Sequence, residues 1–208
     1  IPGTHLIRYG VGDWNDSLQP ADRSLRDTMV SAWTVAILWQ SLTRYAGVLG
    51  RDRGRGRLSD HAGALHALTD RIARDFRAHL MPDGVVAGYA IFDPATGRPR
   101  DYVLHPRDTR TGLRHSLLPM TRSTIAGLFT PEEAARHFAL IREHLLSPDG
   151  ARLMDRPPEY RGGPERIFKR AESAAYFGRE IGLQYTHAHL RYAEALARLG
   201  EAEALYDA

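Results

Sequence analysis

A short loop near the start of the chain gathers the side chains that sugar chemistry needs. It reads Gly12-Asp13-Trp14-Asn15-Asp16, with two carboxylates, an amide and an indole within four positions. An indole can stack on a pyranose ring, amide and carboxylate groups can hydrogen-bond hydroxyls, and a carboxylic acid with a raised pKa can protonate a glycosidic oxygen. Loops rich in Asp, Asn and Gly also form ordinary capped turns, so the residue types alone leave a purely structural role open.

A second polar cluster lies at the entrance to the last predicted helix. Its side chains are Arg179, Glu180, Thr186 and His187. Arg, Thr and His groups at a helix N-terminus suit an anion. His187 and His189 suggest a metal pair, but side chains two residues apart on a helix point to different faces. We therefore expect no metal site, and His189 is interpreted as a core or surface histidine.

The composition is that of an ordinary folded domain or part of one. The chain has 208 residues, of which 43% are apolar and 25% charged, and its net charge is +3. The absence of cysteine excludes disulfides, thiolate zinc sites and cysteine nucleophiles. No apolar stretch reaches membrane-spanning length and no signal peptide is evident, so we expect a cytoplasmic protein without a membrane partner. The Arg- and Gly-rich run 50–57 lacks interleaved aromatic residues, which favours a solvated loop over a nucleic-acid site.

The spacing of apolar residues predicts a mainly α chain with one β-hairpin. We expect helices over residues 22–45, 60–80, 117–128, 131–146 and 183–199, and the hairpin over 85–104. Ser59 and Asp60 are expected to cap the second helix, Thr130 the fourth, and Gly200 to end the last. The irregular stretch 155–163 is expected to be a long loop of the kind that often carries function.

The two polar clusters resemble the two signatures of a known enzyme family. The run from Gly10 to Asp16 is similar to the glycine-rich Gly-Asp-Trp-Asn-Asp signature of the cellobiose-phosphorylase-like glycoside phosphorylases, glycoside hydrolase family 94 and its relatives, which act on β-linked oligoglucans. The runs 178–180 and 184–188 are similar to the second signature, and the two stand in the right order. The resemblance implies an (α/α)6 toroid, with residues 1–208 as a partial catalytic domain covering roughly its second half and carrying a small β-hairpin insertion.

The resemblance also implies roles for individual residues. Asp16 matches the general acid, and Trp14 lines the donor-sugar subsite. The remaining matches are Asp13 and Asn15 as substrate-binding residues that shape the loop, Arg179 and Glu180 at the acceptor sugar, and His187 with Thr186 at the phosphate. Ser17 stands where the family commonly has Gly, and Ile181 and Leu183 also depart from its second signature. The acceptor contacts can therefore differ from those of the family.

The implied reaction is inverting phosphorolysis. Inorganic phosphate, the co-substrate, attacks the anomeric carbon opposite the leaving oxygen and gives α-glucose 1-phosphate, with no further cofactor and with a homodimer as the expected assembly. Two alternatives stay open. An inverting hydrolase would use Asp16 as acid and Glu180 as base, since it needs two carboxyls about 6.5–9.5 Å apart. A helical binding module would use neither.

Overall fold

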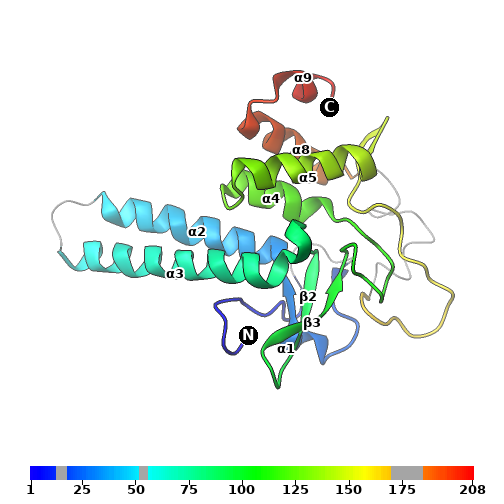
Figure 1. The fold of residues 1–208 in the computed structure, drawn as a ribbon, viewed down its shortest axis with the longest axis horizontal. Coiled ribbons are helices and arrows are strands. Elements are labelled where there is room, and N and C mark those ends of the chain that lie inside the picture. Colours follow the sequence, from blue (N-terminus) through cyan, green and yellow to red (C-terminus); the bar gives the residue numbers. More distant parts are fainter. Residues whose placement is uncertain (13–17, 52–55, 170–184) are drawn as a thin grey trace.

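A computed structural model describes residues 1–12, 18–51, 56–169 and 185–208, and within them the chain is mainly α-helical (Figure 1). The helices are α1 (Leu25–Thr28), α2 (Ala32–Gly50), α3 (Gly56–Leu80), α4 (Leu117–Ala126), α5 (Pro131–His144), α8 (Thr186–Leu199), α9 (Ala202–Tyr206) and the 3-10 turn η2 (Pro82–Gly84). The strands are β1 (Met29–Ser31), β2 (Tyr89–Asp93), β3 (Arg98–Val103), β4 (Leu146–Ser147) and β5 (Gly150–Ala151). The expected fold class is confirmed at this level, whereas the toroid stays a prediction.

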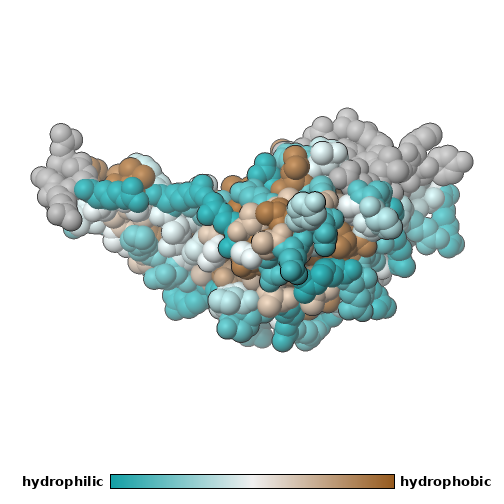
Figure 2. Space-filling model, turned by 90° about the horizontal axis from the view of Figure 1, so that it is seen from above, coloured by the Kyte–Doolittle hydropathy of each residue, from teal (hydrophilic) through white to brown (hydrophobic). Residues whose placement is uncertain are grey.

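The two longest helices, α2 and α3, form a hairpin that projects from the rest of the molecule as an arm (Figures 1 and 2). They are joined along their length by apolar contacts and by the Trp39 indole, which donates to the Thr69 carbonyl at 3.1 Å. The prediction that Ser59 and Asp60 cap α3 is wrong, because the helix begins at Gly56. Leu58 lines an apolar hollow with side chains of α2, and this packing favours an earlier helical start.

A small antiparallel sheet lies beside the base of the arm, in the order β1-β2-β3. The predicted hairpin is confirmed as β2 and β3, whereas the single helix predicted over 22–45 is wrong because β1 interrupts it. All three β1 residues are buried, and Val30 pairs with Ala90 at the centre of the register. Tertiary pairing and burial therefore override the local helical pattern in this segment.

Helices α4, α5 and α8 cover the other side of the core. Nearly all of α4 is buried, between α2 and α8. The predicted start of α5 is confirmed as a capping box, in which Thr130 and Glu133 each accept from the other's backbone N–H. Phe138 of α5 stacks on Tyr192 of α8 with ring centroids 5.6 Å apart. Gly200 ends α8 at φ 76°, as predicted.

Side chains also cross-link α3 and α5. Arg77 donates to Glu133 at 2.8 Å and to the carbonyl of Leu128 at 2.6 Å. His137 is fully buried, and its Nε2 accepts from the backbone N–H of Val86 at 2.9 Å while Nδ1 lies 2.6 Å from the Glu133 carbonyl. Nδ1 therefore carries the proton and Nε2 accepts. Burial lowers the pKa of His137 to about 4, so the ring is neutral at pH 7.

Candidate active site

Aromatic packing fixes the chain that leads into the first motif. The backbone N–H of Tyr9 donates to the Met29 carbonyl at 2.8 Å. The Tyr9 ring lies 5.0 Å from that of Tyr89, which in turn lies 5.2 Å from Phe168. Positions 13–17, which include Asp13, Trp14, Asn15 and Asp16, lie outside the described residues. The described chain thus ties the start of this motif to the core sheet.

The chain that follows the first motif pairs with the chain that precedes the second. Pro20 and Phe168 form an antiparallel bridge. The Ala21 N–H donates to the Ile167 carbonyl at 2.9 Å, and the Lys169 N–H donates to the Gln19 carbonyl at 2.8 Å. Two segments that are remote in sequence, one just after the first cluster and one nine residues before the second, therefore lie side by side.

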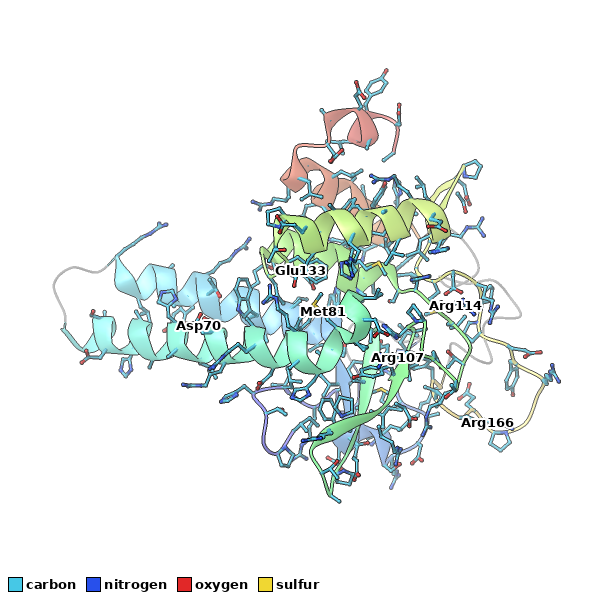
Figure 3. All side chains as sticks on the ribbon, viewed as in Figure 1. Asp70, Met81, Arg107, Arg114, Glu133 and Arg166 are labelled. Atoms are coloured by element: carbon cyan, nitrogen blue, oxygen red, sulfur yellow. The ribbon has the colours of Figure 1, made fainter. Side chains whose placement is uncertain are left out.

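The predicted long loop is confirmed as irregular, and we refer to residues 155–168 as the pocket loop. At its start, Asp155 Oδ1 accepts from the backbone N–H groups of Arg114 and His115 at 2.9 and 3.0 Å. Arg156 donates to the Gly112 carbonyl at 2.7 Å. Its other end is held by the pairing with residues 19–21. The pocket loop is therefore anchored at both ends, on the side of the molecule where Figure 3 labels Arg114 and Arg166.

A pair of stacked imidazole rings supports the start of the pocket loop. His115 and His144 lie face to face, with ring centroids 4.3 Å apart and planes 4° from parallel. Burial, and then the neighbouring His144, lower the pKa of His115 to about 4. His115 is therefore neutral at pH 7, which avoids charge repulsion within the stack.

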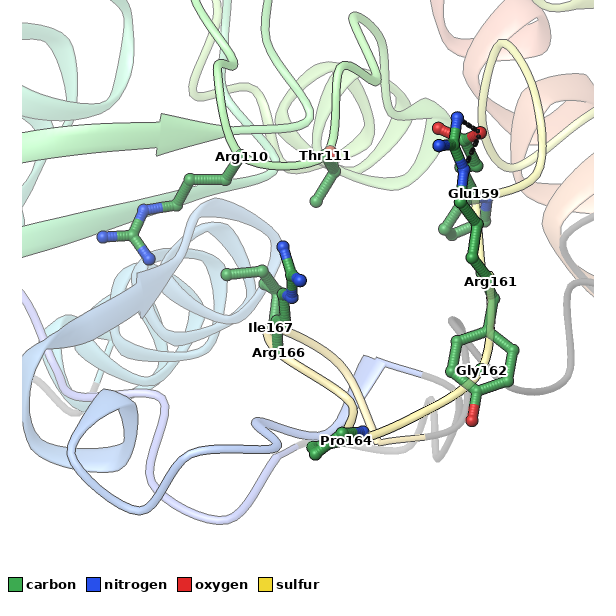
Figure 4. A pocket seen from close by; sticks show the side chains of 10 residues that line it. Arg110, Thr111, Glu159, Arg161, Gly162, Pro164, Arg166 and Ile167 are labelled. Atoms are coloured by element: carbon green, nitrogen blue, oxygen red, sulfur yellow. Dashed lines mark hydrogen bonds and ion pairs between the residues drawn. The ribbon is translucent and has the colours of Figure 1, made fainter.

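The pocket loop encloses one side of a hollow of about 390 Å³. Figure 4 shows Arg166 and Ile167 on one side, Arg161 and Glu159 on the opposite side, and Arg110 and Thr111 along the upper edge. The described residues that line it are Arg110, Thr111, Pro158, Glu159, Tyr160, Arg161, Gly162, Pro164, Arg166 and Ile167. The volume falls within the range of about 300–1,000 Å³ typical of small-ligand pockets, and the lining is rich in arginine.

An aspartate-centred turn holds the upper edge of this hollow. Asp108 Oδ1 accepts from the backbone N–H groups of Arg110 and Thr111 at 2.7 and 2.8 Å. Asp108 Oδ2 accepts from the Leu104 N–H at 2.8 Å. The Arg110 guanidinium then reaches Asp101 Oδ2 through Nε and Nη2, at 2.9 and 2.7 Å. Sequence inspection missed Arg110 and Asp108, although an Asp followed by polar residues and a Gly four positions later is a recognisable turn signal.

The second predicted cluster is described only in part. Arg179 and Glu180 lie outside the described residues, whereas Thr186 and His187 occupy the exposed first turn of α8. The His187 ring meets Tyr185 edge-on, with centroids 6.1 Å apart. His189 is partly buried, and its Nδ1 accepts from the Ala151 N–H at 3.1 Å. His189 therefore makes a structural contact to β5.

Within residues 1–12, 18–51, 56–169 and 185–208, no three His, Asp or Glu side chains gather as metal ligands. Over the same ranges, no helix has the length and apolar character required to cross a bilayer.

Comparison with known proteins gives one informative match. No family model matches the chain. The chain is 43% identical, over 205 residues, to a 1,2-β-oligoglucan phosphorylase of Listeria innocua serovar 6a. The alignment covers 98% of this chain and 18% of that protein, so the chain spans about a fifth of the length of the curated relative. The resemblance inferred from the two motifs is thereby confirmed.

Proposed function

From its relationship to the cellobiose-phosphorylase-like glycoside phosphorylases, we propose that this chain forms part of the catalytic domain of an enzyme that phosphorolyses a β-linked oligoglucan. The substrate that the relative's name supplies is a β-1,2-linked oligoglucan. The products are α-glucose 1-phosphate and an oligosaccharide shortened by one glucose. The identity over 98% of the chain is the single observation that carries this proposal.

In the proposed mechanism, Asp16 donates a proton to the glycosidic oxygen as the bond to the anomeric carbon breaks. An oxygen of inorganic phosphate attacks that carbon from the opposite face and inverts its configuration. Trp14, with Asp13 and Asn15, contacts the donor sugar. Phosphate supplies the nucleophile itself, so the reaction uses no second carboxylate to activate water.

The remaining predicted residues serve the leaving sugar and the phosphate. Arg179 and Glu180 contact the acceptor sugar, and His187 with Thr186 binds phosphate near the N-terminus of α8, where backbone N–H groups favour anions. The pairing of segments 19–21 and 167–169 supports a shared site, because the first segment lies just after the first motif and the second lies nine residues before the second motif. A homodimer and the half-toroid architecture, both drawn from the family resemblance, and a cytoplasmic location complete the proposal.

The test uses the full-length protein that contains this chain. It is incubated with gluco-oligosaccharides of β-1,2, β-1,3 and β-1,4 linkage, with and without inorganic phosphate, and α-glucose 1-phosphate is measured. We expect phosphate-dependent release from the β-1,2-linked substrates. Asp16→Asn is expected to lower kcat about 10²–10⁴-fold because the general acid is lost, whereas Asp60→Asn, a matched change at an exposed position of α3, leaves it unchanged.

The same assay separates the alternatives. Free glucose formed equally without phosphate would indicate the inverting hydrolase, and loss of that activity in Glu180→Gln would then identify its base. Binding of the oligosaccharides without any product would indicate a helical binding module. Either outcome contradicts the phosphorylase proposal.

A further inference from the structure

The arginine-lined hollow beside the pocket loop has preformed walls. The Asp108 turn fixes Arg110 and Thr111 on one edge. The pocket loop is anchored by Asp155 at its start and by the Ile167 carbonyl at its end. Binding there therefore requires little ordering of the backbone, which lowers the entropic cost of binding.

Two of the described arginines that line the hollow, Arg110 and Arg161, already have carboxylate partners. Arg161 donates to Glu159 Oε1 through Nε and Nη2 at 2.8 and 2.5 Å, and Arg110 uses the same two nitrogens toward Asp101. A guanidinium has five N–H donors, so each pair presents further donors beside carboxylate oxygens that accept. Free phosphate prefers cationic groups whose charge is not neutralised. At Arg110 and Arg161 the charge of the guanidinium is offset by a carboxylate, and the resulting alternation of donors and acceptors suits the hydroxyls of a neutral sugar.

Tyr160 adds an aromatic surface to this polar lining. Its hydroxyl donates to the Gly163 carbonyl at 2.9 Å, which fixes the ring within the pocket loop. The side chain keeps 37% of its surface exposed. An aromatic face combined with polar groups at its edge suits a ligand that is apolar on its ring faces and polar around its rim, as a pyranose is.

The hollow also adjoins the first motif along the chain. Ile167 lines it and accepts from Ala21. Ala21 follows Asp16 by five residues, and five residues span at most about 18 Å.

We propose that this hollow binds a glucosyl unit of the oligoglucan that is remote from the scissile bond, and that Arg161 and Tyr160 thereby set the preference of the enzyme for chain length. This inference rests on the proposed function, whose substrate it extends. Arg161 and Tyr160 are substrate-binding residues in this proposal and take no part in proton transfer.

The experiment measures kcat/KM of the full-length enzyme on β-1,2-linked gluco-oligosaccharides of increasing length. Arg161→Gln and Tyr160→Ala are compared with Arg198→Gln, which changes an exposed arginine at the far end of α8. We expect each pocket variant to lose about 10-fold on the long substrates, equivalent to about 1.4 kcal/mol, and to keep wild-type values on the shortest substrate that is cleaved. Arg198→Gln keeps the wild-type profile at every length.

Two results would overturn the assignment. One is an equal loss of kcat/KM, or no loss, at all lengths. The other is a raised KM for inorganic phosphate with an unaltered length profile, which would make the hollow an anion site.

Calorimetric titration of the oligosaccharides without phosphate gives a readout independent of turnover. If the wild type releases no glucose 1-phosphate at any length, the proposed function fails. The titration then decides this inference alone, since affinity that rises with length and is lost in Arg161→Gln supports it, and unchanged affinity refutes it.

Discussion

The α2–α3 arm and the pocket loop are organised in opposite ways. The arm is regular secondary structure, and its large buried side chains, such as Val35 and Phe76, lie toward the end that joins the body, whereas Ala46 and Ala62 are buried farther out. Toward its free end, Tyr45 and Val48 expose 57% and 62% of their surface. The pocket loop has no regular structure, yet its two ends are held by hydrogen bonds to segments distant in sequence. The arm is therefore ordered mainly by contacts within and between its own two helices, whereas the pocket loop is ordered by hydrogen bonds to segments elsewhere in the chain.

This difference indicates how substitutions in each region will affect stability. In the arm and the helices beside it, stability depends on apolar burial near the body and on a few buried polar contacts. In the pocket loop it depends on single anchoring groups, because few buried apolar side chains hold the loop in place. The following predictions test that division, from the largest expected effect to the smallest.

Phe76→Ala is expected to have the largest effect. Phe76 is completely buried on α3 and meets Phe129 edge-on with centroids 6.5 Å apart. Removing the ring leaves a cavity and should lower the free energy of unfolding by about 3–5 kcal/mol. Val48→Ala, at the exposed end of α2, should change it by less than about 0.5 kcal/mol. Urea unfolding of both variants checks the contrast, and equal losses would contradict it.

Acidification should destabilise the helical side through His137. Its pKa is lowered by burial to about 4, below the ordinary value of 6.5, so the unfolded chain binds more protons between these values. The contribution is complete above about pH 6.5 and is lost as the pH falls toward 4. The total is on the order of 3 kcal/mol. Protonation of Nε2 would also remove the acceptor of the Val86 N–H.

The measurement is the free energy of unfolding at several pH values between 4 and 7. His137→Gln should reduce the pH dependence in this range, leaving the part that His115 contributes, and should lower the stability at pH 7. His66→Gln, at an exposed position of α3, serves as the control and should keep the wild-type slope. A slope unaffected by His137→Gln would show that another group titrates.

Asp155→Ala should have a smaller and more local effect. It removes the acceptor shared by the Arg114 and His115 N–H groups, and hydrogen bonds to a charged group contribute about 1.5–3 kcal/mol. Amide hydrogen exchange should accelerate at these two positions and through the pocket loop, while α3 stays protected. Asp149→Ala changes a carboxylate whose 3.3 Å contact to Arg152 lies at the surface, and it should leave exchange in the pocket loop unaltered.

The accuracy of the sequence predictions follows the same division. The start of α5 and the end of α8 are predictable because Thr130 and Gly200 act on their own helices. β1 is not predictable from local pattern, because its strand conformation depends on pairing with β2, about 60 residues later in the chain. The start of α3 is missed for a related reason, since Leu58 packs against α2.

The candidate site shows a sharper limit. The two sequence motifs identify Asp16 and His187 as candidate site residues, and the relative supports the family resemblance on which that identification is based. The sequence also identifies a long loop after residue 155. It does not predict that the end of this loop pairs with residues 19–21, because that pairing uses backbone groups that any residue carries. It also does not predict that Arg110 lines the same hollow as the loop.

The bridge between Pro20 and Phe168 has a consequence for biosynthesis. Its two residues are about 150 positions apart in the chain, and ribosomes add about 5–20 residues per second. During synthesis, on the order of ten seconds or more therefore pass between the appearance of the segment next to the first motif and that of its pairing partner. Such long-range contacts form slowly, so the sheet and the arm can fold before this bridge closes. Closure of this bridge is then a late event in the folding of the chain.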